Sequence, residues 1–127
     1  MTRFLSHDWV AELDQVLRAA VVPSGGERLV IQQRVNAEPP IEWHVDLGAG
    51  GGAAAVGRSP SPTIELHQDL RTAVAVARGD ISAEEALLTG RISVRGDIEA
   101  AARHRARFGD LSAALDTLRD RTEYPEL

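Results

Sequence analysis

Four histidines are the residues of this chain best suited to bind a metal ion or transfer a proton near neutral pH. They are His7, His44, His67 and His104. A zinc hydrolase places two histidines four residues apart on one helix beside a glutamate, and no pair here has that spacing. His44 and His67 fall on the polar faces of two different predicted strands, so they meet only if those strands are neighbours. The sequence therefore predicts solvent-facing histidines and no metal site.

The glycines and serines that could bind phosphate or act in catalysis are not set in the sequence motifs that such functions require. The glycine run Gly48–Gly52 has no Lys-Ser/Thr pair and joins two predicted strands, which favours a hairpin turn over a phosphate loop. Ser59 and Ser61 lie in a proline-rich loop without a nucleophile elbow. The absence of cysteine excludes a disulfide scaffold, a thiolate zinc site and a cysteine nucleophile. We predict no catalytic residue and no cofactor.

The charge balance argues against nucleic acid as a partner. All basic residues are arginine, and the formal net charge is −5, whereas nucleic-acid binding needs a concentrated cationic surface. A Lys-free, Arg- and Ala-rich composition is typical of a GC-rich bacterial genome. In the basic cluster of the last predicted helix only Arg103 and Arg107 share a face, because residues two apart lie on opposite sides of a helix. A solvated helix face is favoured there, and a transient membrane contact is the alternative.

Two polar residues fall on apolar faces. Gln33 shares its strand face with Leu29, Ile31 and Val35, and a buried amide without a partner costs about 1–3 kcal/mol. It must either bond to backbone or face an internal cavity or its mouth. His104 lies on the apolar face of the last predicted helix, where a satisfied core or boundary histidine is commoner than a catalytic base.

The first half of the chain predicts one helix followed by four strands. Ser6 can cap the helix, and a proline-glycine stretch at 23–26 ends it. Strict alternation is clearest at 41–47, and 28–35, 53–57 and 63–67 are weaker strands. The apolar helix positions are Trp9, Leu13, Val16, Leu17 and Ala20.

The second half is mostly helical. Asp69 can cap a helix closed by Gly79, and the capping box at 82–85 opens a short helix closed by Gly90. A strand at 91–95 precedes a last helical region that Asp97 caps and Gly109 interrupts.

The element order α-β-β-β-β-α-α-β-α predicts an α+β fold with one sheet and a single layer of helices on its apolar face. A length of 127 residues with 43% hydrophobic residues fits one domain over 1–127, with its core at roughly 7–120. No apolar run reaches the ~18 residues of a membrane span, and no signal peptide is visible, so a cytoplasmic location is expected.

The stretch from Thr63 to Asp97 carries a resemblance. An apolar strand at 63–66 is followed by the acidic-capped helix that starts at Asp69-Leu70 and ends at Ala77-Arg78-Gly79. The run at 81–97, ISAEEALLTGRISVRGD, then supplies a Ser-Ala-Glu-Glu helix, a glycine, an alternating strand and Gly-Asp. This pattern and its spacing resemble the sterol carrier protein 2 (SCP-2) family over roughly residues 7–120.

The resemblance implies a five-stranded mixed sheet with helices covering one face. It also implies an apolar tunnel between sheet and helices that takes a fatty acid, acyl-CoA, phospholipid or sterol-like lipid. Such a domain binds and carries lipid without catalysing a reaction, or presents lipid within a larger enzyme. The small aliphatic inward positions here agree, since they leave more room for a chain-like ligand than a phenylalanine-packed core.

We predict ten apolar tunnel walls and two polar contacts at the mouth, and we read Gly90, Gly96 and Asp97 as fold-defining. The predicted ligand-binding residues are Gln33, Trp43, Val45, Leu66, Val74, Leu88, Ile92, Val94, His104, Phe108, Leu111 and Leu115.

Two rival functions remain open. One is a small α+β isomerase or cyclase acting on an apolar substrate, with His104 or Asp46 as base. The other is a protein-interaction module with a filled core and an apolar surface patch. The sequence leaves the identity of the lipid and the oligomeric state open.

Overall fold

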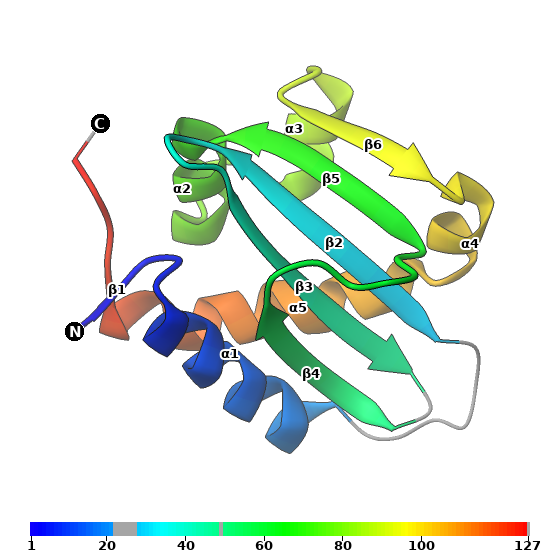
Figure 1. Cartoon of the computed structure of the whole chain (residues 1–127), viewed down its shortest axis with the longest axis horizontal. Coiled ribbons are helices and arrows are strands. Elements are labelled where there is room, and N and C mark those ends of the chain that lie inside the picture. Colours follow the sequence, from blue (N-terminus) through cyan, green and yellow to red (C-terminus); the bar gives the residue numbers. More distant parts are fainter. Residues whose placement is uncertain (22–27, 49, 127) are drawn as a thin grey trace.

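A mixed five-stranded sheet forms the centre of the computed structural model, which describes residues 1–21, 28–48 and 50–126. The strands lie in the order β4-β3-β2-β5-β6, and only the β2–β5 pair is parallel. The helices cover one face of the sheet (Figure 1), which confirms the predicted α+β class. The predicted chain turn at 23–26 and Ala49 of the glycine turn lie outside the described residues. The strands are β2 (Leu29–Asn36), β3 (Ile41–Gly48), β4 (Gly51–Val56), β5 (Ile64–Asp69) and β6 (Ile92–Gly96).

Helix α1 (His7–Ala20) begins at the predicted cap, where the Ser6 hydroxyl accepts a hydrogen bond of 3.1 Å from the Trp9 amide. Trp9, Leu13 and Leu17 of its apolar stripe are buried, whereas Val16 is half-buried and Ala20 is exposed. The helix packs over β4, and Asp14 accepts a 2.9 Å bond from the Ala54 amide there. Because β4 is an edge strand, this bond satisfies an amide that no neighbouring strand could pair.

The two middle helices begin and end near the residues that the sequence indicates. Helix α2 (Leu70–Arg78) has Asp69 as its N-cap and Gly79, with φ of 81°, as its C-cap. Helix α3 (Ala83–Leu88) starts at Ser82, whose hydroxyl accepts from the Glu85 amide. Gly79 supplies the left-handed conformation that lets the chain leave α2.

Gly96, the last residue of β6, and Asp97 hold the start of α4 (Ile98–Arg103) against the sheet. Gly96 has φ of 107°, and a Cβ there would lie 2.6 Å from the Thr63 carbonyl oxygen. That carbonyl accepts a 2.9 Å bond from the Asp97 amide, and the Asp97 carboxylate caps α4 through the Ala100 amide. The space and the backbone conformation both require glycine at 96, so the fold-defining role predicted for this pair is confirmed.

Three features differ from the sequence-based expectation. The last helical region divides into α4 and α5 (Arg105–Leu118), and the break falls at His104, not at Gly109. Gly109 stays helical because its cost of about 1 kcal/mol is small beside the packing of α5 on either side of it. A short 3₁₀ turn η1 (Arg119–Arg121) follows, and β1 (Thr2–Arg3) pairs in parallel with β7 (Thr122–Glu123).

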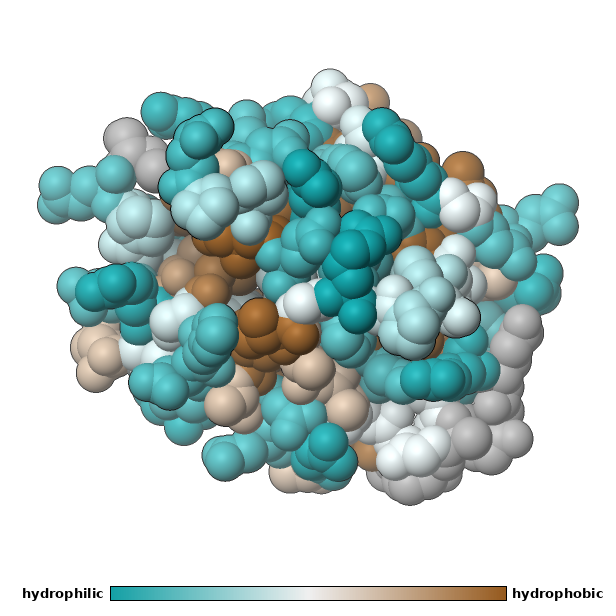
Figure 2. Space-filling view, viewed as in Figure 1, coloured by the Kyte–Doolittle hydropathy of each residue, from teal (hydrophilic) through white to brown (hydrophobic). Residues whose placement is uncertain are grey.

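The sheet face away from the helices is polar, as Figure 2 shows, with hydrophobic patches between the polar side chains. Arg58 bridges Glu42 on β3 and Glu65 on β5, at 3.0 and 2.9 Å. His44 and His67 lie on this side of β3 and β5, which β2 separates, so the two histidines are not on neighbouring strands. In the part of the chain that the structure describes, no helix is both long and apolar enough to cross a bilayer.

Candidate functional site: a cavity between sheet and helices

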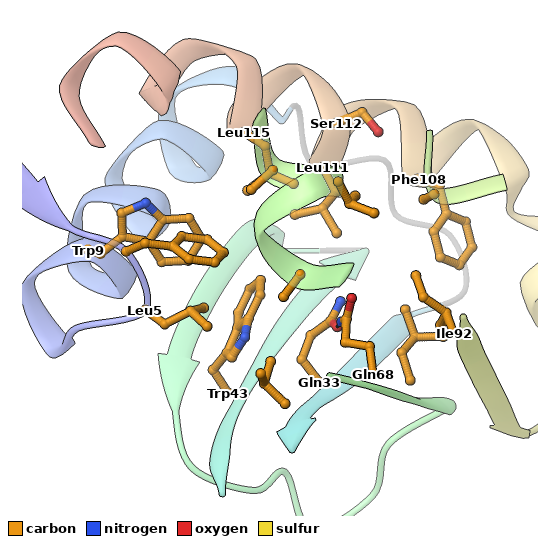
Figure 3. Close-up of a pocket in the computed structure, with 17 residues that line it drawn as sticks. Leu5, Trp9, Gln33, Trp43, Gln68, Ile92, Phe108, Leu111, Ser112 and Leu115 are labelled. Atoms are coloured by element: carbon orange, nitrogen blue, oxygen red, sulfur yellow. The ribbon is translucent and has the colours of Figure 1, made fainter. Parts of the chain in front are cut away.

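A cavity of about 80 Å³ lies between one end of the sheet and the helices (Figure 3). Its floor is the end of the sheet where β2 and β5 finish and β3 and β6 begin. Helix α5 faces that floor, and α1, α2, α3 and the segment before α1 close the sides. The wall is formed by Phe4, Leu5, Trp9, Gln33, Val35, Trp43, Leu66, Gln68, Ala73, Val76, Ala77, Ala83, Ile92, Phe108, Leu111, Ser112 and Leu115.

Seven of the twelve predicted ligand-binding residues lie in this wall. On the sheet, Gln33 is in register with both Trp43 and Leu66, which places the three side by side across β3, β2 and β5. The sheet and helix members of this group face one another across the cavity in Figure 3. The seven are Gln33, Trp43, Leu66, Ile92, Phe108, Leu111 and Leu115.

The other five predicted residues do not line this cavity. Val45 and Val74 are buried in the core and Val94 is half-buried, and none of the three is in the cavity wall. Leu88, at the end of α3, is 81% exposed. Alternation identifies the face of a strand but not the end over which a cavity lies, and a six-residue helix has too few turns to define a face. His104 is the residue between α4 and α5 and does not line the cavity.

Sequence reasoning missed wall residues of two kinds. Val35 and Gln68 have the same strand parity as Gln33 and Leu66, so the alternation could have identified them. Phe4 and Leu5 precede the first helix, where no period exists to read. Leu5 also has φ of 63°, in the left-handed region that few non-glycine residues adopt.

The cavity wall is apolar except at a few positions. The Gln68 side-chain NH₂ donates a 2.8 Å hydrogen bond to Gln33 Oε1, so Gln33 pairs with a side chain inside the cavity and not with backbone. Trp43 is 5% exposed, and within the described residues its indole N–H has no acceptor. Ser112 is exposed and marks the open side. None of the described residues that form the wall carries a formal charge.

The chain has two Phe, two Trp and one Tyr, and these few aromatic rings gather at the site. Phe4 meets Trp9 edge to face at 5.0 Å between ring centroids, and Trp9 meets Trp43 at 5.6 Å. Tyr124 packs on Phe4 from outside at 5.3 Å. Phe108 lies in the wall on α5. A small number of rings therefore suffices to close one end of the cavity.

The two candidate bases of the rival enzyme are not in the cavity. Asp46 lies on the opposite face of the sheet, where the Arg28 guanidinium contacts both of its carboxylate oxygens. His104 stands at the α4–α5 junction. Among residues 1–21, 28–48 and 50–126, no three His, Asp or Glu side chains group closely enough to hold a metal ion.

Comparison with known proteins places this geometry in a family. Residues 11–108 match the model of the SCP-2 sterol transfer family. The chain belongs to the SCP-2 sterol transfer family. No curated protein matches the chain. The family match spans α1 from residue 11 onward, the whole five-stranded sheet, α2, α3, α4 and the first turn of α5.

Solved SCP-2 structures share the fold. A crystal structure of sterol carrier protein 2 superposes with a TM-score of 0.67 at 19% identity, covering 88% of this chain and 96% of that one. A conserved hypothetical protein from Thermus thermophilus gives 0.71 at 19% identity, with 97% and 92% covered. Sterol carrier protein 2 like 2 from Aedes aegypti gives 0.57 at 26% identity, with 73% and 85% covered. These likenesses establish the five-stranded sheet with its helical layer.

Proposed function

We propose that this SCP-2 chain is a single lipid-carrying domain, which binds the apolar part of a lipid in the cavity between sheet and helices and catalyses no reaction on it. The observation that carries the proposal is the uncharged, mostly apolar wall of that cavity in a member of this family. Removing an alkyl chain from water contributes about 0.8 kcal/mol per CH₂, which is the driving force such a wall can use.

The size of the cavity sets a condition on binding. A volume of about 80 Å³ is below the roughly 150 Å³ of an apolar cavity that admits benzene. A second hollow of about 350 Å³ lies beside it on the surface between α2, α3 and α5, and shares Val76, Ala83, Ser112 and Leu115 with it. Val76 and Leu115 line both spaces and are only half-buried. The proposal therefore requires these two side chains to move aside, so that an alkyl chain can occupy both spaces.

Native mass spectrometry of the purified protein, followed by organic extraction, tests the proposal directly. We expect a co-purified fatty acid, phospholipid or other lipid, or else displacement of a fluorescent fatty acid by added lipid at micromolar protein. A ligand-free spectrum together with no binding of the fluorescent fatty acid refutes the carrier function.

Filling the cavity provides a matched pair of variants. Ala73 on α2 lines the cavity and is 7% exposed, so Ala73→Leu places three further carbon atoms where the alkyl chain would lie. We expect lipid affinity to fall at least about tenfold, the equivalent of 1.4 kcal/mol, while the cooperative unfolding transition is retained. The control is Ala113→Leu, the same change at an exposed position of α5, which should leave lipid affinity unaltered. Equal affinities for both variants would place the lipid elsewhere.

The small enclosed volume favours one second candidate, an interaction module with a filled core. The exposed side chains of Leu87 and Leu88 on α3 give it an apolar surface to use. In that case Ala73→Leu changes no binding property, whereas Leu88→Gln abolishes partner binding.

A further inference from the structure

We propose that Gln33, Gln68 and the indole N–H of Trp43 form a polar subsite inside the cavity that receives an uncharged hydrogen-bonding group of the lipid, a hydroxyl in particular. The inference rests on the proposed lipid-binding function and specifies the class of lipid. It predicts a neutral alcohol-bearing lipid as the preferred cargo over a lipid whose buried end is a carboxylate.

The two glutamines are built into the floor from adjacent parallel strands. Gln33 on β2 is in register with Leu66, and Gln68 follows two residues later on the same face of β5. Both are more than nine-tenths buried, at 5% and 8% exposed, and their amides meet at 2.8 Å. In Figure 3 both amides stand in the cavity opposite Leu111 on α5. A wall made only to exclude water would carry aliphatic side chains at these positions.

One hydrogen bond between two amides leaves one NH₂ group and one carbonyl oxygen without a partner in the pair. The Gln33 NH₂ and the Gln68 carbonyl oxygen have no hydrogen-bond partner among the described residues. If both amides were turned over, the pair would still keep one unused NH₂ group and one unused carbonyl. The subsite therefore offers both a donor and an acceptor to whatever enters the cavity.

Trp43 adds a second donor. It lies directly across from Gln33 in the β2–β3 ladder, and its Nε1 is buried without an acceptor in the described structure. Figure 3 shows this nitrogen on the sheet side of the cavity, and the side chains of Gln33 and Gln68 extend from the same side. The nearby Trp9 contrasts with it, because its indole N–H is used by the Thr122 hydroxyl at 3.2 Å. A buried donor left unpaired costs stability unless a ligand group satisfies it.

The pattern of donors and acceptor selects the chemistry of the ligand. A hydroxyl can accept from an indole or amide N–H and donate to the free carbonyl at the same time. A carboxylate only accepts, so it would leave the carbonyl unpaired. It would also bring a charge into a wall where no described residue carries a compensating one. Decan-1-ol and decanoate, which have the same number of carbons, therefore test the difference between the two head groups.

The first measurement is calorimetric titration of the intact chain with decan-1-ol, decanoate and decane at neutral pH. We expect decanol to bind at least about tenfold more tightly than decanoate, which is about the difference in affinity that one hydrogen bond contributes. Decanoate binding as tightly as decanol would overturn the preference for a neutral group.

The variant Gln33→Met with Gln68→Met removes the amides and keeps the side-chain length. Because both partners of the bond are replaced together, the fold should be retained. We expect the ratio of decanol to decane dissociation constants to rise about tenfold, since decane loses nothing and decanol loses its partners. Leu66→Val is the control, because it lines the same floor without a polar group and should shift both ligands alike. If the two amides only hold β2 against β5, the double variant will be less stable but its ratio of decanol to decane dissociation constants will equal that of the wild-type chain. That result would refute the subsite.

Nuclear magnetic resonance of ¹⁵N-labelled protein locates the hydroxyl. Decanol should shift the side-chain NH₂ signals of Gln33 and Gln68 and the indole signal of Trp43, with the Trp9 indole signal as the internal reference. If decanol binds but does not shift these signals, the subsite is refuted and the carrier function still stands. Binding of none of the three ligands refutes both.

Discussion

Gln32 and Gln33 are neighbours in β2, and their side chains point to opposite faces of the sheet. Their amides therefore have different hydrogen-bond partners. Gln33 faces the cavity, whereas Gln32 is fully buried under the loop between β4 and β5. The Gln32 NH₂ donates to the carbonyls of Trp43 and Gly57 at 3.1 Å each, and its carbonyl accepts from the Ser59 amide at 2.8 Å. One side chain thus replaces the strand pairing that the loop backbone lacks.

The Gln32→Leu variant should be among the most destabilising single changes on this face. It leaves the Ser59 amide buried without a partner, which costs about 1–3 kcal/mol in the free energy of unfolding. Urea denaturation measures this cost, and Gln15→Leu on the exposed side of α1 is the control. A loss below about 0.5 kcal/mol, the ordinary range for a surface substitution, would show that the loop does not depend on Gln32.

At the scale of the element, the helix caps explain why the boundaries were readable. Ser6, Asp69, Ser82 and Asp97 each accept a hydrogen bond from an amide in the first turn that follows. Asp69 has a further consequence, because its bonds to Thr72 lower the pKa of the carboxyl below the ordinary 3.8 and outweigh its partial burial. The charged form therefore stabilises the folded chain at neutral pH.

The contribution of Asp69 should depend on pH with a definite sign. A lowered folded-state pKa gives stability that is complete above the pKa of the unfolded chain and is lost as the pH falls through the folded value. We expect the stability difference between the wild-type chain and Asp69→Asn to be constant above about pH 5 and to shrink below it. Denaturant titrations across the acid range measure it, and a difference unchanged down to pH 2 would contradict the assignment. Asp69→Ala should cost about 1 kcal/mol at neutral pH through loss of the cap.

Periodicity and caps were enough to predict the sheet and the order of its strands along the chain. The alternation at 41–47 became β3, and the apolar stripe after Ser6 became α1. What escaped prediction has no period to read. Strands β1 and β7 are only two residues long each. The break between α4 and α5 arises from the backbone conformation of His104, with φ of −110° and ψ of 32°.

The site was less predictable than the sheet, because its position depends on where the helices come to lie. Val45 and Trp43 share one face of β3, yet only Trp43 lies under the open end. The polar character of Gln33 was informative, since a buried amide must find a partner, but the partner Gln68 is 35 residues away. Only the parallel pairing of β2 with β5 brings the two together.

For the molecule as a whole, the first and last segments close the fold on each other. The Phe4 amide donates to the Glu123 carbonyl at 3.0 Å beside the β1–β7 pair. Thr122 accepts from the Trp9 indole and donates to the Leu118 carbonyl at 2.7 Å, joining α1 to the end of α5. Since Phe4, Leu5 and Trp9 line the cavity, this closure also fixes one end of the site.

Thr122→Val tests that closure with little change of shape. The buried Trp9 N–H loses its acceptor, so we expect about 1–3 kcal/mol of destabilisation and faster hydrogen exchange at the Phe4 amide. Thr117→Val is the control, because the Thr117 hydroxyl bonds to the Ala113 carbonyl at an exposed position. Equal stability of the two variants would mean that the chain ends close independently of Thr122.

The edge-to-face pair of Trp9 and Trp43 has an optical consequence. Both tryptophans of the chain stand in the wall of the cavity, with ring centroids 5.6 Å apart and planes at 88°. At that separation their electronic transitions couple, and no third indole elsewhere dilutes the signal. Near-ultraviolet circular dichroism and intrinsic emission therefore report almost entirely on this one place. The unlabelled protein is its own sensor of whether the cavity is empty or filled.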